Sequence, residues 1–175
     1  MKKTVLTFGL ISGVISSVLM AGNMALIDKT GFDNATYLGY TAIVLSFMLV
    51  FFGIKSYRDN LNGGLVSFGK AFQVGILITL ISCACYVATW EVVYRTNQGA
   101  MDDFMDKYTA HVIEKEKSSG ASEAALQEKK AEMADIKEIY RNPVFRAGMT
   151  FLEPFPVGLV ITLASAGILR RKERR

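Results

Sequence analysis

Four ionisable residues stand out in this sequence because each lies at the edge of a long apolar stretch. Glu91 closes one such stretch, and Arg95 lies one helical turn after it. Glu153 interrupts another stretch, and Arg146 precedes it by about two helical turns. If the two stretches are neighbouring helices, two carboxylates and two guanidinium groups gather at one level. Such a cluster could attract a cation or a proton, but salt bridges that only fix helix packing are the favoured interpretation.

Two prolines follow Glu153 and bear on its chemistry. Pro154 and Pro156 lack backbone N–H groups, so the carbonyl groups four residues before them lose their helical partners. A carboxylate beside free carbonyl oxygens is an environment that can hold a cation. The cation or proton alternative therefore centres on Glu153.

The remaining reactive side chains form no catalytic set or metal site. His111 is the one histidine and lies in a charged segment, whereas Cys83 and Cys85 lie in an apolar stretch and point to nearly opposite sides of a helix. Residues 64–70 have the glycine and lysine spacing of a phosphate-binding loop. However, Ala71 replaces the Ser or Thr that would hold magnesium, and no buried strand precedes the loop. No catalytic residue, cofactor or metal ligand is predicted, and the chain is not expected to be an enzyme.

Charged and apolar residues are separated along the chain, which is typical of a membrane protein. Residues 4–27 hold no charge, and as a helix they would be about 36 Å long, enough to cross a hydrocarbon core about 30 Å thick. A cleaved signal peptide is the alternative for this stretch, but its apolar part would be shorter. Four membrane-spanning helices are predicted, at residues 4–27, 35–54, 71–94 and 147–169.

Small residues recur every four positions in the first predicted span, at Gly9, Gly13, Ser17 and Ala21. A stripe of this kind lets another helix approach closely. We expect that partner to be a helix of the same chain rather than a second copy. Gln73, near the start of the third span, is expected to form a hydrogen bond to another helix.

Residues 96–142 differ from the rest of the chain in composition. Between positions 95 and 141 the sequence holds ten acidic and eight basic residues, and the run Ser118-Ser119-Gly120 separates two amphipathic segments. Ser122 is a candidate N-cap for the second segment. The predicted fold is all-α: one membrane domain over residues 1–175 with a bundle of four transmembrane helices. An extracytoplasmic α-helical hairpin is predicted at residues 96–142, between spans 3 and 4.

Basic residues indicate the orientation of these spans. They occur at Lys2 and Lys3, in the loop 55–70 and at five of the six positions 170–175. The opposite side has Lys29 and the long charged segment, whose charge counts little in this rule. We therefore expect a multi-pass protein of the bacterial inner membrane with both termini cytoplasmic. Basic residues placed at span ends give no indication of nucleic-acid binding.

Two groups of residues resemble a known family. The first comprises Lys55-Ser-Tyr-Arg-Asp59, Gly63-Gly64 and Ser67-Phe-Gly-Lys-Ala-Phe72; the second comprises Tyr140, Asn142, Pro143, Thr150-Phe-Leu-Glu-Pro154 and Pro156-Val-Gly-Leu159. The chain resembles bacterial integral membrane proteins catalogued as domain of unknown function 4199, over its whole length. The resemblance implies four spans and an outside hairpin. It implies no catalytic residue, because the family has no established activity.

The sequence favours a structural or partner-binding membrane protein. Its partners would be the lipid bilayer and a periplasmic or membrane protein that docks on the hairpin, whose two helices each carry an apolar face. The alternative is a small transporter or channel component with Glu91 and Glu153 at its outer mouth. A membrane-embedded enzyme is the least favoured class, because few polar residues lie within the spans. The oligomeric state stays open.

Overall fold

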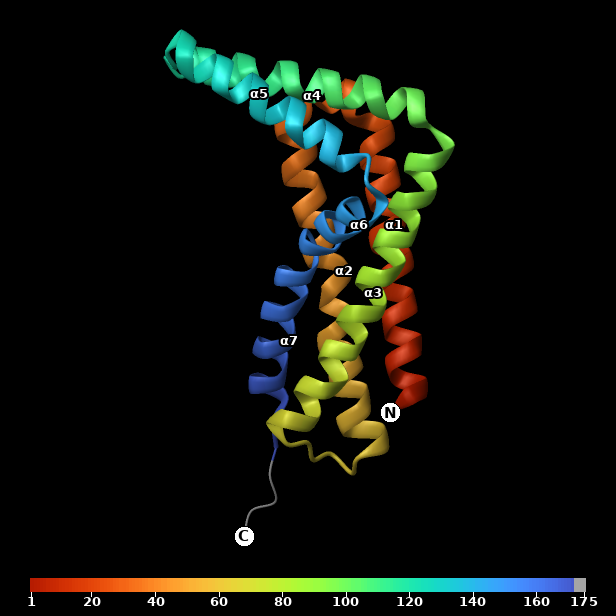
Figure 1. The fold of residues 1–175 in the computed structure, drawn as a ribbon. Coiled ribbons are helices and arrows are strands. Elements are labelled where there is room, and N and C mark those ends of the chain that lie inside the picture. Colours follow the sequence, from red (N-terminus) through yellow and green to blue (C-terminus); the bar gives the residue numbers. More distant parts are fainter. Residues whose placement is uncertain (172–175) are drawn as a thin grey trace. The chain divides into compact units, whose positions relative to one another are not determined.

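The computed structural model describes residues 1–171, so the predicted basic residues Lys172, Arg174 and Arg175 lie outside the described part. Its helices are α1 (Lys2–Thr30), α2 (Phe32–Leu61), α3 (Phe68–Thr96), α4 (Gln98–Ser118), α5 (Glu123–Tyr140), α6 (Pro143–Leu152) and α7 (Phe155–Leu169) (Figure 1). The chain forms two compact units. The membrane bundle comprises Met1–Trp90 and the segment from Thr150 onwards, and the charged unit comprises Glu91–Met149.

Four helical segments are long and apolar enough to cross a membrane, which confirms the four predicted spans. They are Lys2–Thr30, Phe32–Leu61, Phe68–Thr96 and Pro143–Leu169. The last segment is α6 followed by α7, with a break at Glu153 and Pro154. The sequence leaves a polar link between the first two predicted spans, but in the structure only Gly31 separates α1 from α2, with φ +76°. Glycine adopts this left-handed conformation without strain, so the two helices are longer than predicted and their turn is tight.

The core of the membrane bundle lies between α2, α3 and α7. Its most buried apolar side chains, each at most 1% exposed, include Phe47, Val50 and Ile54 of α2, Val74 and Ile78 of α3, and Ala166 of α7. Lipid tails are as apolar as these side chains, so close van der Waals packing must hold the helices together rather than exclusion of water.

Glycines bring α3 and α7 into close contact. A Cβ atom on Gly75 of α3 would lie 2.8 Å from Thr162 Cγ2 of α7. A Cβ atom on Gly158 of α7 would lie 2.5 Å from Thr79 Cγ2 of α3. Both distances are too short for real side chains, so only glycine allows this helix separation. At the same contact the hydroxyl oxygens of Thr79 and Thr162, both fully buried, lie 3.0 Å apart and share a hydrogen bond.

Buried serines connect α1 to its neighbours. Ser12 Oγ donates a hydrogen bond to the Ser46 carbonyl oxygen of α2 over 2.9 Å. Ser82 Oγ of α3 donates to the Gly9 carbonyl oxygen over 3.1 Å. Hydrogen bonds between helices satisfy polar groups that lipid could not.

The outer surface of the bundle is apolar along its helices. Exposed large side chains include Leu6, Leu10, Val14 and Val18 of α1, Leu38, Leu45 and Met48 of α2, and Val160, Leu163 and Ile168 of α7. In water so many exposed apolar residues would be unfavourable, whereas lipid tails accept them.

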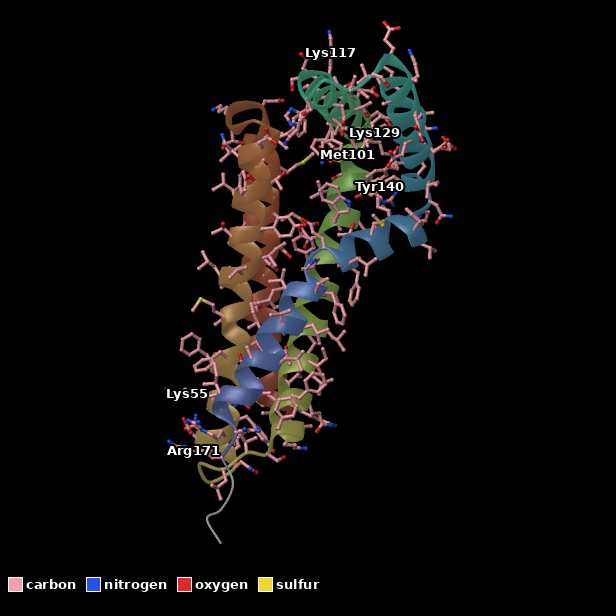
Figure 2. The ribbon with its side chains drawn as sticks, turned by 90° about the vertical axis from the view of Figure 1, so that its left-hand side faces the viewer. Lys55, Met101, Lys117, Lys129, Tyr140 and Arg171 are labelled. Atoms are coloured by element: carbon pink, nitrogen blue, oxygen red, sulfur yellow. The ribbon has the colours of Figure 1, made fainter. Side chains whose placement is uncertain are left out.

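One end of the bundle joins the end of α7 to the loop between α2 and α3. Val66 and Arg171 exchange two backbone hydrogen bonds of 3.1 and 2.9 Å. Arg58 Nη1 also donates to the Leu169 carbonyl oxygen over 3.4 Å. Figure 2 shows Lys55 and Arg171 at this same end, so basic residues from distant parts of the sequence lie together.

The first turn of α3 contains a helix cap and one corrected prediction. Ser67 Oγ accepts a hydrogen bond from the Lys70 backbone N–H over 3.3 Å, so Ser67 caps the helix. Gln73 does not bond to another helix as expected: its Oε1 accepts from Lys70 Nζ over 2.9 Å on the same helix. The reason is that Gln73 lies on the exposed face of α3.

In the charged unit, α4 and α5 pack side by side (Figure 1). Ser122 Oγ accepts a hydrogen bond from the Ala125 backbone N–H, so it caps α5 as predicted. Lys137 of α5 forms an ion pair with Asp106 of α4. Met133 of α5 is buried, whereas most side chains around it on the helix are exposed and polar, which is the pattern of a helix in water.

Candidate functional site

The polar contacts of the charged unit gather around one buried arginine, Arg146. Arg146 of α6 is only 3% exposed. Its Nε and Nη2 atoms donate to the two carboxylate oxygens of Glu91 over 2.8 and 2.7 Å, so the pair is bidentate. Glu91 lies near the end of α3, and the ion pair therefore joins α3 to α6.

The rest of the Arg146 guanidinium is also occupied. Nη1 donates to the carbonyl oxygens of Tyr140 and Arg141 over 3.1 and 3.4 Å. The Cζ atom lies 3.7 Å from the centre of the Tyr94 ring, a cation–π contact. The Tyr94 and Tyr140 rings also contact each other, with centres 6.1 Å apart. The guanidinium donates four hydrogen bonds and has one face covered by a ring. This arrangement, the Arg146 clamp, suits structural support better than ligand binding.

Local capping positions Arg146. Asn142 Oδ1 accepts hydrogen bonds from the backbone N–H groups of Val144 and Phe145, and Pro143 occupies the first helical position. The chain therefore turns sharply between α5 and α6. Arg146 lies one turn into α6 and points back at the carbonyl oxygens that end α5.

Arg95 is a weaker member of this set. Its Nε atom lies 3.7 Å from Glu91 Oε2, and its side chain is 69% exposed. An exposed pair of this kind contributes little stability. Of the four predicted site residues, the structure brings Glu91, Arg95 and Arg146 together in the charged unit.

Glu153, the fourth predicted residue, belongs to the membrane bundle. Its Oε2 atom accepts a hydrogen bond from the buried Tyr86 hydroxyl of α3 over 3.2 Å. Glu153 as a residue is exposed, although it lies within an apolar span. An exposed ionisable group in a span is uncommon and marks a candidate for function.

The predicted stripe on α1 lies partly against α3. A Cβ atom on Gly9 would lie 2.9 Å from Ile81 Cβ, and one on Gly13 would lie 2.6 Å from Cys85 Cβ. Ser17 is buried and Ala21 is half-buried. The contacts of the two glycines are with a helix of the same chain.

Sequence reasoning did not find Tyr86 and Tyr94. Helical spacing could have pointed to both tyrosines. Tyr94 lies three residues after Glu91 on α3, and Tyr86 lies about two turns before Tyr94. That spacing gives the side of α3 on which they lie, but not which residue of another helix faces them. Within residues 1–171, no group of three or more His, Cys, Asp or Glu side chains could hold a metal ion.

The fold and its polar contacts define a class: an α-helical membrane protein with four spans and a charged helical pair inserted before the last one. The family described as "Protein of unknown function (DUF4199)" matches residues 7–171, and the chain belongs to this family. No curated protein and no solved structure matches the chain.

Proposed function

We propose that this protein is a bacterial inner-membrane protein that presents the α4–α5 pair outside the cytoplasm as a docking element for another protein. The observation that carries the proposal is the Arg146 clamp. It ties the end of α3 to the start of α6, and these are the two points where the chain enters and leaves the α4–α5 pair. A rigid base of this kind reduces the ordering entropy that a docking element loses on binding.

The surface of the pair supports docking. Tyr108 of α4 and Ile136 and Ile139 of α5 are exposed among charged residues. The ion pair between Asp106 and Lys137 brings their turns to the same level of the pair. Apolar side chains framed by charge are the composition of a transient protein interface.

The distribution of basic residues supports the orientation. Lys55, Lys70 and Arg171 lie at the end of the bundle that contains the α2–α3 loop. Lys2 and Lys3 begin α1, whose other end turns directly into α2, so they lie at that end as well. Basic flanks favour the cytoplasmic side.

Site-specific photo-crosslinking tests the docking proposal. A photoreactive amino acid at Ile139 is expected to capture one protein in living cells, and the same amino acid at the exposed Ala131 of α5 serves as the matched control. Capture of that protein at Ile139 and not at Ala131 would support docking. Equal capture at both positions, or none at either, would overturn it.

Orientation has a separate test. Ala131→Cys and Asn60→Cys introduce exposed thiols on α5 and near the α2–α3 loop. A membrane-impermeant maleimide added to cells with a permeabilised outer membrane is expected to label only Ala131→Cys. Labelling of Asn60→Cys alone would reverse the orientation.

Transport of a proton or small cation is a second candidate, favoured by the presence of an ionisable residue, Glu153, within an apolar span. The Tyr86 hydroxyl that donates to it would orient the carboxylate. Purified protein in vesicles is expected to conduct protons or sodium ions, and Glu153→Gln to stop the flux. The control is Glu138→Gln, which removes the carboxylate of an exposed residue on α5. Equal flux in all three proteins, or none in the unaltered protein, would remove this candidate.

A further inference from the structure

The polarity of α6 is reversed relative to a helix in water. Its two buried side chains are Arg146, 3% exposed, and Thr150, 5% exposed. Its exposed side chains are apolar: Val144 is 80% exposed, Met149 49% and Leu152 58%. A helix surrounded by water would place these residues the other way round.

After its first residue, the exposed residues of α6 form one continuous surface. At 3.6 residues per turn, five of the six exposed positions, all except the first residue Pro143, cover an arc of about 140°. The arc comprises Val144, Phe145, Gly148, Met149 and Leu152. Arg146 and Thr150 lie on the opposite side, so no charged side chain interrupts this surface, the α6 apolar arc.

The Arg146 clamp fixes the rotation of α6 about its own axis. Rotation that turned the apolar arc inward would pull the guanidinium away from Glu91 and from the Tyr94 ring. That would leave the buried Arg146 guanidinium and the half-buried Glu91 carboxylate without each other, which is strongly unfavourable. The arc is therefore held outward, and what surrounds it must accept apolar side chains.

Two observations identify the lipid bilayer as what covers the arc. First, α7 alone has 15 residues and is about 22 Å long, shorter than a hydrocarbon core of about 30 Å, so residues before it must also meet lipid. Second, the segment from Pro143 to Leu169, which includes all of α6, is long and apolar enough to cross a membrane. A partner protein would need a separate apolar groove for a surface that the bilayer already suits.

We propose that the α6 apolar arc binds phospholipid acyl chains at the outer edge of the membrane and fixes the point where the chain passes from lipid to water. The change falls at Arg141 and Asn142, where the charged residues of α5 stop and α6 begins. Amphipathic helices at this depth place apolar residues among acyl chains just below the headgroups. This inference is independent of the docking proposal, because it concerns α6 and not the α4–α5 pair.

Tryptophan fluorescence tests the inference, since Trp90 is the chain's only tryptophan. Trp90→Phe supplies a silent background, and its loss of an indole N–H without a hydrogen-bond partner is expected to be tolerated. Phe145→Trp then reports on α6 and Ile139→Trp on α5. These two positions are matched, because both side chains are apolar and 45% exposed.

The variants are placed in phosphatidylcholine vesicles with or without bromine atoms on the acyl chains, and acrylamide is added as a quencher from water. Phe145→Trp is expected to be quenched strongly by bromine and weakly by acrylamide, and Ile139→Trp the reverse. Val144→Trp, at the most exposed position of the arc, should repeat the result for Phe145→Trp. Quenching of both α6 reporters by acrylamide and not by bromine would overturn the inference. Resistance of both to either quencher would also overturn it, because a protein would then cover the arc.

Discussion

The membrane bundle and the α4–α5 pair both bury apolar side chains, but their outer surfaces are opposite. The bundle exposes residues such as Val18 and Ile168, whereas the pair exposes Glu138 and Asp106. The buried residues therefore do not distinguish a helix in lipid from a helix in water, and the exposed ones do. α6 sharpens this comparison, since most of it lies in the charged unit while its surface resembles that of the bundle.

The largest expected effect is at the one buried charge of the described charged unit. Arg146→Ala leaves the Glu91 carboxylate, whose side chain is 18% exposed, without its bidentate partner. Breaking such a pair is expected to lower the free energy of unfolding by about 3 kcal/mol. Thermal unfolding in mild detergent, followed by circular dichroism, measures the loss.

Arg95→Ala is the matched control for Arg146→Ala, because both arginines face the same carboxylate. Arg95 is exposed, so its loss is expected to cost less than about 1 kcal/mol. Arg146→Lys keeps the charge but loses the bidentate geometry and the ring contact, so its stability should lie between those of the other two variants. Equal stability of Arg146→Ala and Arg95→Ala would show that the clamp does not support the charged unit.

A smaller effect is expected in the bundle, where shape rather than charge controls packing. Gly13→Ala places a Cβ atom 2.6 Å from Cys85 Cβ, so α1 and α3 must separate, at a cost of about 2 kcal/mol. Gly22→Ala on the same helix meets no atom within 4 Å. It is expected to be neutral, or stabilising by up to about 1 kcal/mol, because alanine favours helix more than glycine. Thermal unfolding of the two variants measures this difference in stability. Equal unfolding temperatures for Gly13→Ala and Gly22→Ala would exclude close α1–α3 packing.

The smallest effect is expected on the surface of the α4–α5 pair. Lys137→Ala removes the ion pair with Asp106, whose side chain is 67% exposed. The cost should be about 0.5 kcal/mol and should shrink at high salt, because exposed charges are screened. A double-mutant cycle with Asp106→Ala, measured at low and high salt, gives the coupling energy between the two side chains. A coupling that is large and independent of salt would mean that this surface is not bathed in water.

The four spans could be predicted from the sequence because a span must be apolar over its whole length, and that is a local property. The caps at Ser67 and Ser122 could also be predicted, since each depends on a few neighbouring residues. The link between α1 and α2 was predicted at the right place in the chain but too long. Its polar residues suggested a loop, but a single glycine at Gly31 suffices to turn the chain.

Contacts between helices were harder to predict because they depend on how each helix is rotated. The spacing of Glu91 and Arg95 on one helix gave their pairing directly. The sequence placed Arg146 near the same level but could not show that it would point at Glu91, with two backbone carbonyl groups and Tyr94 around it. The predicted hydrogen bond from Gln73 to another helix was wrong for the same reason, since its side of α3 faces outward.

The contact between Thr79 and Thr162 has a consequence for the order in which the protein matures. The ribosome makes α3 well before α7, so for a time Thr79 is in the membrane without the hydroxyl that shares its hydrogen bond. The glycine surface of α3 at Gly75 is likewise uncovered during that interval. α7 covers this surface once it has been made. The backbone hydrogen bonds between Val66 and Arg171 then join the end of α7 to a loop made much earlier. Nascent chains that stop before α7 would therefore keep the Thr79 hydroxyl without this partner in the membrane.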